Sequence, residues 1–460
     1  MMTKQVSAQS KMQFITIEDL MPKEHFLRDV YNAIDFSFVY DRVEHLYSNV
    51  GRPSIDPVII AKIFLIGYLY DIASERKLMN EIQVNIAYRW FLGIDLDESV
   101  PDHSTLSQLR RRKFNDSRIF EDIFDEIVRK CIEIGLVTGE TLLTDSTHLR
   151  ANVANDKREV ITVALEPTAY MKKLDEMALT EGLIKEISGP SNKTTEQIKS
   201  TTDPDCGILN RPGKPKGFHY LNHQTVDAVN GIITDVHVTS GNINDCVPHV
   251  ERIKYQIKKF GFDTKEIGGD AGYDVPEIHA EMLNMGIKTF IPKINWQNQH
   301  AEKTYSVKDF HYDYDNDEYI CPNNCRLRFN HFKKGRGMKT YASKISDCKK
   351  CPRRTMCMSN RSKIKKVARP YHKTEYEIQH QNNNTQRYNE IMLYRKIWCE
   401  GTFAHQKAWH SLTRAKMRGI AQTKGQCLLS ACAVNIKRMI KWMKSTASSH
   451  QRSVFLLLFA

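Results

Sequence analysis

The sequence predicts an α/β protein with a mixed-sheet core, an all-helical N-terminal region and an inserted cysteine-rich subdomain. Three observations lead to this fold class. Apolar residues recur at helical spacing through the first 115 residues. Strand-like and helical runs alternate from about residue 116 to 294, as they do in α/β proteins. Five of the 11 cysteines fall between residues 321 and 357, within a polar and basic stretch.

Size and charge limit the kinds of partner. A chain of 460 residues can form two or three domains. It holds 67 Lys and Arg against 54 Asp and Glu, a net charge of +13, which favours a polyanionic partner such as nucleic acid. The N-terminus shows no apolar signal core, and the longest apolar run, residues 57–70, is shorter than the ~20 residues of a membrane span. We therefore expect a cytoplasmic protein without a membrane segment.

Residues 1–115 are expected to form a helical DNA-binding domain. Asp56 is a candidate N-cap for a buried helix over 57–70, with Pro57 at its first position. A later helix in "DHSTLSQLRRRKF" ends in a basic run, which suits a helix-turn-helix-like unit. Cations also favour a helix C-terminus on a solvated surface, so both interpretations stay open. The DNA-binding candidates in this run are Arg110, Arg111 and Arg112.

Residues 116–294 are expected to form the first part of the core, interrupted by a polar insertion at about 151–215. The run Leu142-Leu143-Thr144 has the pattern of a short buried strand that ends at Asp145. A hairpin follows the insertion, with its turn at Asn230-Gly231, a pair preferred in two-residue turns.

In "IGGDAGYD", Asp270 ends a second short strand and lies between small residues. A helix follows, with Asp274 as the expected N-cap and Pro276 in its first turn, and then a further strand-like run, "IKTFIPK". The order strand, helix, strand puts Asp270 at the carboxyl end of its strand, where α/β sheets usually hold their sites. A turn aspartate that only caps a helix is the alternative.

Residues 386–445 are expected to form the C-terminal helical part of the core. Read as a helix, they place Glu400 on a stripe with Leu393, Ile397 and Ala404. A glutamate on an apolar stripe is costly unless a cation or hydrogen bonds compensate it, and a local ion pair is the alternative. Three converging carboxylates, Asp145, Asp270 and Glu400, would suit hard divalent cations such as Mg²⁺. Two such ions can support phosphodiester chemistry.

The cysteines lie in a basic insertion at about 295–385. Its residues include the tight pair Cys348-x-x-Cys351, and four thiolates around Zn²⁺ would form a structural site. The favoured ligands are Cys321, Cys348, Cys351 and Cys357, although Cys325 could replace one of them. Reduced cysteines without metal are the alternative. With its many lysines and arginines, the insertion is expected to grip DNA.

Together, "LLTDSTHLRAN", "IGGDAGYD" and "CEGTFAHQK" resemble the DDE transposases of bacterial insertion sequences, in the branch with a Y-R-E-K signature. Lys407 matches the lysine that the family places seven residues after the glutamate. The family's arginine and tyrosine positions are occupied by Lys396 and Leu393, with Arg395 and Tyr394 each displaced by one. The segment "VPDHSTLSQLRRR", the hairpin and the C-terminal helices are also similar to the family, over roughly residues 15 to 445.

The resemblance implies a ribonuclease H-like core and a catalytic triad of Asp145, Asp270 and Glu400. These residues would hold two Mg²⁺ (or Mn²⁺) ions, while Lys407 and Arg395 would contact phosphate. It implies binding to the terminal inverted repeats of an element, 3′-strand cleavage and joining to target DNA, by a homodimer on paired ends in the bacterial nucleoid. The hairpin acids Asp227 and Asp235 are then structural or peripheral, and residues 446–460 form a tail without an assigned role.

Two other functions stay open. One is a catalytically inactive, zinc-containing DNA-binding protein derived from a transposase. The other is a stand-alone ribonuclease H-like nuclease, which would explain the three acids but not the N-terminal helical domain.

Overall fold

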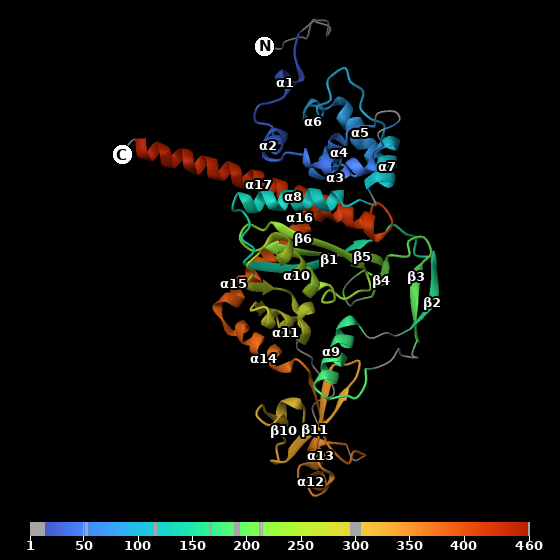
Figure 1. The fold of residues 1–460 in the computed structure, drawn as a ribbon, viewed down its shortest axis with the longest axis vertical. Coiled ribbons are helices and arrows are strands. Elements are labelled where there is room, and N and C mark those ends of the chain that lie inside the picture. Colours follow the sequence, from blue (N-terminus) through green and yellow to red (C-terminus); the bar gives the residue numbers. More distant parts are fainter. Residues whose placement is uncertain are drawn as a thin grey trace, which may run out of the picture.

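The computed structural model describes residues 14–48, 50, 54–114, 117–164, 168–187, 194–210, 213, 215–294, 305–359 and 361–458. A helical region lies at one end of the long axis, the main sheet lies in the middle, and a smaller module that carries the cysteine cluster lies at the other end (Figure 1). This arrangement confirms the predicted fold class of a helical N-terminal region followed by a mixed α/β core. No helix among the described residues is long and apolar enough to cross a membrane.

The N-terminal helical region is built around one buried helix, α4. Asp56 caps it by accepting a hydrogen bond from Val58 N at 2.7 Å, and Pro57 occupies its first turn, as predicted. Every residue from Ile60 to Leu69 is buried, because a helix that is apolar on all sides needs neighbours all round. The helices are α1 (Ile17–Leu20), α2 (Phe26–Ala33), α3 (Phe38–Val43), α4 (Pro57–Leu69), α5 (Glu75–Val84), α6 (Ile86–Leu92) and α7 (His103–Leu109).

The main sheet has six strands, in the order β4-β5-β1-β7-β8, with β6 also paired to β5. Strand β5 is antiparallel to β1, β4 and β6, whereas β7 runs parallel to β1 and to β8. Three antiparallel pairings and two parallel ones give the mixed sheet expected of a ribonuclease H-like core. The strands are β1 (Thr141–Arg150), β4 (Gly207–Leu209), β5 (Gly217–Asp227), β6 (Ile233–Ser240), β7 (Glu266–Gly268) and β8 (Lys288–Phe290).

Two local predictions in the sheet were wrong. Strand β1 does not end at Asp145, because its antiparallel pairing with β5 continues to Arg150↔His219. The hairpin does not have a two-residue turn at Asn230-Gly231. Asp227 N bonds to Ile232 O at 2.8 Å, so the loop has four residues, and the Asp227 carboxylate stabilises it by accepting from Val229 N at 2.9 Å.

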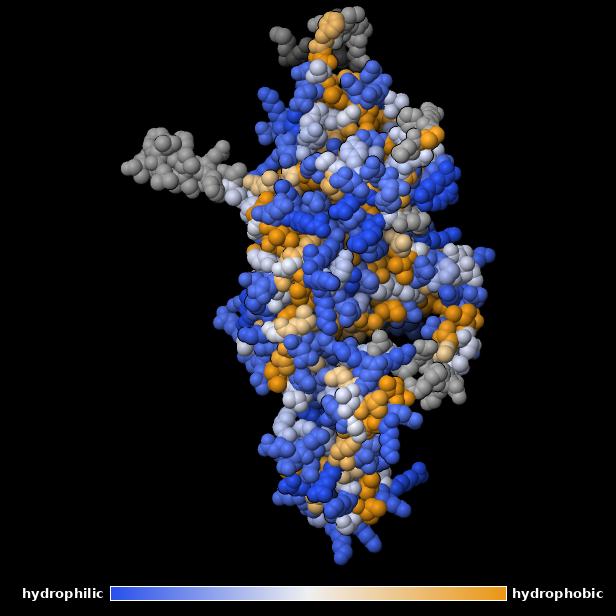
Figure 2. Space-filling model, viewed as in Figure 1, coloured by the Kyte–Doolittle hydropathy of each residue, from blue (hydrophilic) through white to orange (hydrophobic). Residues whose placement is uncertain are grey.

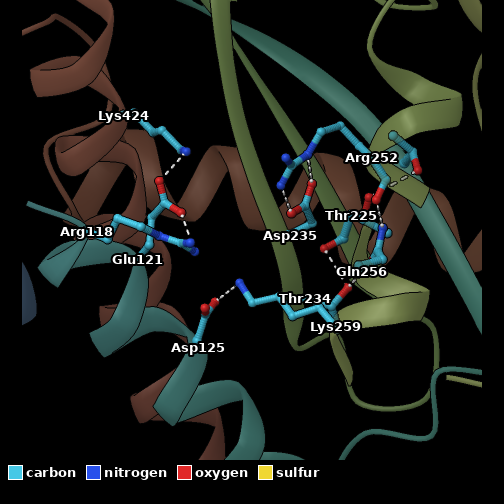
Figure 3. Close-up of polar contacts among 11 residues, drawn as sticks. Arg118, Glu121, Asp125, Thr225, Thr234, Asp235, Arg252, Gln256, Lys259 and Lys424 are labelled. Atoms are coloured by element: carbon cyan, nitrogen blue, oxygen red, sulfur yellow. Dashed lines mark hydrogen bonds and ion pairs between the residues drawn. The ribbon is translucent and has the colours of Figure 1, made fainter. Parts of the chain in front are cut away.

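Helices surround the sheet and connect it to the helical region. They are α8 (Ile119–Glu133), α10 (His249–Phe260), α11 (Pro276–Asn284), α14 (Lys373–His380), α15 (Gln386–Arg395), α16 (Gly401–Trp409) and α17 (Ile420–Leu458). Figure 3 shows the polar contacts where α8, α10 and α17 meet. Lys259 of α10 pairs with Asp125 of α8, and Arg118 pairs with Glu121 at 3.2 Å. Thr234 of β6 donates to Gln256 of α10 at 2.8 Å.

The two hairpin acids have structural partners. Asp235 accepts from Arg252 Nε at 2.9 Å, a contact visible in Figure 3. Asp227, which is fully buried, accepts from Gly139 N at 2.8 Å and Thr138 N at 3.1 Å. Both acids are therefore engaged in holding loops and helices, which agrees with the structural role predicted for them.

The two polar insertions pack against each other. Helix α9 (Ala169–Thr180) of the first contacts the turn after β11 of the second, where Gly335 N donates to Asp175 at 3.1 Å. The first insertion also holds a hairpin of β2 (Arg158–Ala164) and β3 (Thr194–Ser200). The second, which we call the cysteine module (residues 305–370), holds β9 (His311–Asp313), β10 (Glu318–Ile320), β11 (Arg326–Lys333), β12 (Met338–Ala342), α12 (Ile345–Lys349), α13 (Arg354–Cys357) and β13 (Lys366–Pro370).

Helix α14 lies within the range predicted for the second insertion, but it packs on the core. Gln379 donates to Ile287 O at 2.7 Å and accepts from Thr289 N at 3.0 Å, next to β8. The chain thus returns to the sheet before residue 385. On the face shown in Figure 2, the cysteine module is covered mainly by hydrophilic residues, with a few apolar patches between them.

Candidate active site

Three of the predicted carboxylates line one cavity of about 370 Å³, which we call the acid cavity. Asp145 comes from β1, Asp270 follows β7, and Glu400 closes the turn between α15 and α16. Strands β1 and β7 pair in parallel as far as Leu143↔Gly268, so the residues just beyond that pair emerge at the same edge of the sheet. The sheet register therefore brings Asp145 and Asp270 together across 125 residues of sequence.

Asp270 also caps a short turn. Its Oδ1 accepts from Gly272 N at 2.8 Å, at the start of the 3₁₀ turn Ala271–Tyr273. The capping interpretation of the sequence is therefore correct for one oxygen of Asp270. It does not exclude the site interpretation, because the same carboxylate faces the acid cavity.

The acid cavity is electrostatically unfavourable for anions. Burial, and then the negative charge of Asp270, raise the pKa of Asp145 to about 7. Burial and the charges of Asp145, Asp245 and Asp270 raise the pKa of Tyr273, which lies beside them, well above its usual value. A carboxylate kept partly protonated at neutral pH by its neighbours is a site that a cation would stabilise.

Arg395 supplies the positive charge that the structure places in this cavity. Its Nη1 donates to Asp145 Oδ2 at 3.0 Å and its Nη2 donates to Glu400 Oε1 at 2.7 Å. The sequence predicted a phosphate contact for Arg395. In the structure its guanidinium instead bridges two of the three acids.

A π-helical turn, Lys396–Glu400, explains how Arg395 reaches Glu400. In an α-helix the side chains that meet are three or four residues apart, whereas Arg395 precedes Glu400 by five. The wider turn takes up the extra residue and restores the contact. The one-residue displacement of the arginine in the sequence is thus matched by a one-residue change in the helix.

A glycine lets α15 approach the sheet closely. A Cβ on Gly268 would lie 2.6 Å from Ile391 of α15 and 2.9 Å from Leu143 of β1. Ile391 is fully buried at this contact. Gly268, two residues before Asp270, therefore allows α15, the helix that leads to Glu400, to pack closely on the sheet. The stripe predicted around Glu400 is not buried, since Leu393 and Ile397 are 55% and 47% exposed.

Three further polar residues line the acid cavity and were not predicted: Ser146, His148 and Asp245. Ser146 links two acids, because its N donates to Asp145 Oδ1 at 2.7 Å and its Oγ donates to Asp245 at 2.8 Å. Asp245 lies in the loop after β6, in "GNINDC", where no strand or helix pattern signals a site.

The predicted basic residues are dispersed. Lys407 lines a different cavity, beside the loop between α16 and α17. Arg110 pairs with Glu75, and its guanidinium lies 4.2 Å from the centroid of the Phe64 ring, so it is part of the helical packing. Arg111 and Arg112 are exposed.

All five cysteines of the cluster line one small cavity in the cysteine module: Cys321, Cys325, Cys348, Cys351 and Cys357. Cys321 Sγ accepts from Asn323 N and Cys325 N, each at 3.4 Å, so backbone donors already face this sulfur. Ser343 Oγ lies 3.0 Å from Cys348 Sγ. The structure places the four predicted ligands around this cavity, and Cys325 lines it as well.

A separate group was missed by sequence reasoning. Among the described residues, Asp274, His279 and His380 form the one group of three or more potential ligands whose atoms all lie within 4.8 Å of one another. The prediction that Asp274 is the N-cap of α11 was wrong, because Val275 occupies that position. Its carboxylate instead accepts from Ile294 N at 2.7 Å and from the two histidines, at 3.1 and 2.8 Å.

The hydrogen bonds around Asp274 account for this group without a metal. Asn383 donates to Ile291 O and to His380 Nδ1, so the proton of neutral His380 is on Nε2, where it faces Asp274. Burial alone would raise the pKa of Asp274, but the bonds from His279 and His380 outweigh it and hold that pKa well below its usual range. We interpret the group as a buried hydrogen-bond network that connects α14 to α11.

The donor set of the acid cavity fits a hard divalent cation. Its acidic ligands are carboxylates, which are the ligands that Mg²⁺ and Mn²⁺ prefer. The pKa of Asp145 is raised by burial and by Asp270 even though Arg395 lowers it, so added positive charge in this cavity would favour the Asp145 carboxylate.

Comparison with protein families matches two parts of this chain. Residues 15–112 match a family described as a transposase domain, and residues 320–440, which include Glu400 and Lys407, match one described as a transposase DDE domain. The chain belongs to the DDE transposases. No curated protein matches the transposase significantly.

Among solved structures, the transposase aligns with a piggyBac transposase in a synaptic complex with hairpin DNA. The two are 10% identical, and the alignment covers 91% of this chain and 82% of that one, with a TM-score of 0.23. A similarity this low carries no structural argument.

Proposed function

We propose that the transposase binds the ends of its own insertion sequence, cleaves the 3′ strands with metal-activated water and joins the freed 3′-hydroxyl to target DNA. The observation that carries the proposal is the convergence of Asp145, Asp270 and Glu400 on one cavity of a ribonuclease H-like sheet. The partner is DNA, both the terminal inverted repeats and the target, and the working form is a homodimer on paired ends in the bacterial nucleoid.

In this proposal Asp145, Asp270 and Glu400 would hold two divalent ions, Mg²⁺ or Mn²⁺, whose chemistry would be to activate a water and to stabilise the leaving oxygen. Arg395 offsets the charge of Asp145 and Glu400 in the metal-free protein. If bound cations offset that charge instead, the Arg395 guanidinium would be available to contact the substrate phosphate. Ser146 keeps Asp145 oriented through its backbone N–H.

The remaining predicted groups take supporting roles. Arg111 and Arg112 are exposed at the end of the basic helix and are proposed to contact DNA, with Lys407 in its own cavity. Arg110 is proposed to hold the helix in place through Glu75. A structural Zn²⁺ is proposed in the cysteine module, on Cys321, Cys348, Cys351 and Cys357.

The two alternatives are less well supported. An inactive DNA-binding descendant would not need to keep three acids around one cavity. A stand-alone nuclease would not need the N-terminal region that matches a transposase domain.

The test is the Asp270→Asn variant, which removes one metal-binding charge and almost no volume. We expect cleavage of end-containing DNA with Mg²⁺ to fall by at least about 100-fold, a typical cost of losing one charge-stabilising group. DNA affinity should stay within about two-fold, measured by fluorescence anisotropy. Asp263→Asn is the matched control, because Asp263 is exposed and pairs with Lys265 outside the acid cavity. Full cleavage by Asp270→Asn would overturn the assignment.

A further inference from the structure

A second cavity, of about 430 Å³, lies between the helical region and the core, and we call it the seam cavity. Asp71, in the turn after α4, lines one wall. The other wall is lined by Asn152, just after β1, and by the loop between α16 and α17, which carries Arg414 and Lys416. Lys407 of α16 lines this same cavity. The cavity is therefore shared by two parts of the fold that lie far apart in sequence.

The loop is fastened to the end of β1. Ala415 N donates to Arg150 O at 2.8 Å, and Asn152 donates to Lys416 O at 3.1 Å. The side chain of Asn152 also orients Arg414, whose Nη2 donates to its Oδ1 at 3.0 Å. The cations of the seam cavity are thus held by the same strand that carries Asp145.

Positive charge outweighs negative charge there, because Lys407, Arg414 and Lys416 line the cavity together with one acid, Asp71. Of the described residues, none offers a carboxylate within salt-bridge distance of Arg414 or Lys416. The ammonium of Lys416 lies 4.4 Å from the centroid of the Tyr68 ring. Burial, and then the positive charge of Arg110, lower the pKa of Lys416 to about 8. An anion in the cavity would relieve this charge.

The cavity also has a strained margin. Asp71 and Ser411 both line the cavity. Both are non-glycine residues with positive φ, 54° and 55°. Ser411 Oγ donates to Asp71 Oδ1 at 2.6 Å, which holds both turns in this conformation. Strained backbone of this kind is found preferentially at ligand sites.

We propose that the seam cavity binds a backbone phosphate of the DNA substrate, held by Arg414 and Lys416 and oriented by Asn152. The inference rests on the proposed function, because the phosphate belongs to the same DNA that the acid cavity cleaves. Arg150 lies five residues beyond Asp145 on β1, roughly 17 Å along the strand. The bound phosphate would therefore lie roughly 17 Å from the cleaved one, which is a few nucleotides along the duplex. A phosphate bound at this site would link DNA binding by the helical region to the position of the scissile bond in the acid cavity.

The test measures binding of an end-containing duplex at several salt concentrations for wild type, Lys416→Gln and Arg414→Gln. Each variant should bind three- to ten-fold more weakly, and the slope of log affinity against log salt should fall by about 0.9 for each lost phosphate contact. Lys265→Gln, an exposed lysine paired with Asp263, is the matched control and should match wild type. Unchanged slopes in both variants would overturn the proposal.

Two further measurements separate phosphate binding from a structural role. Lys416→Arg keeps the charge and should restore the slope; a loss equal to that of Lys416→Gln would assign Lys416 to packing and overturn the proposal. In the wild-type protein, acetylation of Lys416 followed by mass spectrometry should slow at least five-fold when DNA is bound, while Lys265 reacts at an unchanged rate. Equal rates at Lys416 with and without DNA would also overturn it.

The outcome is distinguishable from failure of the proposed function. With Mg²⁺, Asp270→Asn should lose cleavage but keep the wild-type salt slope, since Asp270 does not line the seam cavity. Neutral methylphosphonates placed one at a time at the second to sixth nucleotide from the cleaved bond should weaken DNA binding by the wild type at one position, and have no effect there on Lys416→Gln. If wild type cleaves end DNA but ignores all of these substitutions, the seam cavity proposal alone is wrong.

Discussion

At the scale of single residues, Asp145 carries the least favourable charge of the acid cavity. It is enclosed by the sheet, close to Asp270, and its one strong cationic partner, Arg395, is shared with Glu400. The result is a carboxyl group whose pKa is raised to about 7. For such a group, binding a proton or a metal ion is more favourable than remaining a free carboxylate. Its protonation therefore reflects the electrostatic environment of the cavity.

Asp145 should therefore make the metal-free protein pH-sensitive. Because its folded pKa, about 7, exceeds the unfolded value near 4, its contribution to stability is present at low pH and is lost as pH rises through 7. With a chelator at pH 8, Asp145→Asn should be more stable than wild type, on the order of 1–3 kcal/mol. Near pH 5 that difference should shrink, as measured by thermal unfolding. An equal difference at both pH values would contradict the raised pKa.

Sequence reasoning at this scale succeeded where a residue's environment is local. The cap on α4 depends on Asp56 and the next three residues, so it could be read directly. Asp274 was misassigned because its partners, His380 and Tyr376, lie over 100 residues away. The roles of the three acids remain predictions, although the structure places them around one cavity.

At the scale of elements, the cysteine module is a small sheet with little core of its own. Its buried cluster contains Phe310, Tyr319, Leu327, Tyr341 and Val367. A core of this size rarely stabilises a unit alone, and a structural metal is a common supplement. The cysteine cavity lies beside this cluster, with Leu327 lining both.

Purified protein should accordingly contain about one zinc per chain, because closing four thiolates on the ion fixes α12 and α13 to the sheet. Cys351→Ser should lower the zinc content at least two-fold and increase protease cleavage between residues 320 and 360. Cys246→Ser, outside the module, is the matched control. Protein purified without chelators but free of zinc, by metal analysis, would return the cysteines to a metal-free role.

Strand and helix limits were predictable only in part. The alternation of strand and helix identified the core, and the α/β class is confirmed. The extension of β1 beyond Asp145 depends on pairing with β5, about 75 residues later, which no local pattern reveals. The π-helical turn at Lys396–Glu400 was likewise not predicted. The one-residue displacement of Arg395 from the family's arginine position was the only sign of it that we find in the sequence.

At the scale of the whole molecule, the helical region and the core share helix α17. Lys444 of α17 pairs with Asp29 of α2 at 2.7 Å, and His410 Nδ1, just before α17, lies 2.7 Å from Tyr68 O of α4. Buried residues of both regions belong to one continuous cluster. The helical region and the core therefore share one hydrophobic core.

A fragment of residues 116–460 should consequently be less stable than the whole chain. Without α2 and α4, buried apolar residues of α17, such as Leu428 and Met439, lose neighbours in that cluster. We expect its unfolding midpoint to fall by more than about 5 °C, or the fragment to aggregate, in light-scattering and thermal measurements. A soluble fragment with an unchanged midpoint would show that the two regions fold independently.

The position of α17 has a consequence for the order of events at the ribosome. Synthesis proceeds from the N-terminus at about 5–20 residues per second, and domains usually fold as they emerge. Here Asp145 and Asp270 emerge well before Glu400, and α17, on which both regions pack, is made after all three. A nascent chain therefore cannot assemble the acid cavity early. The cavity can form only after the segments from α15 to α17 have been made.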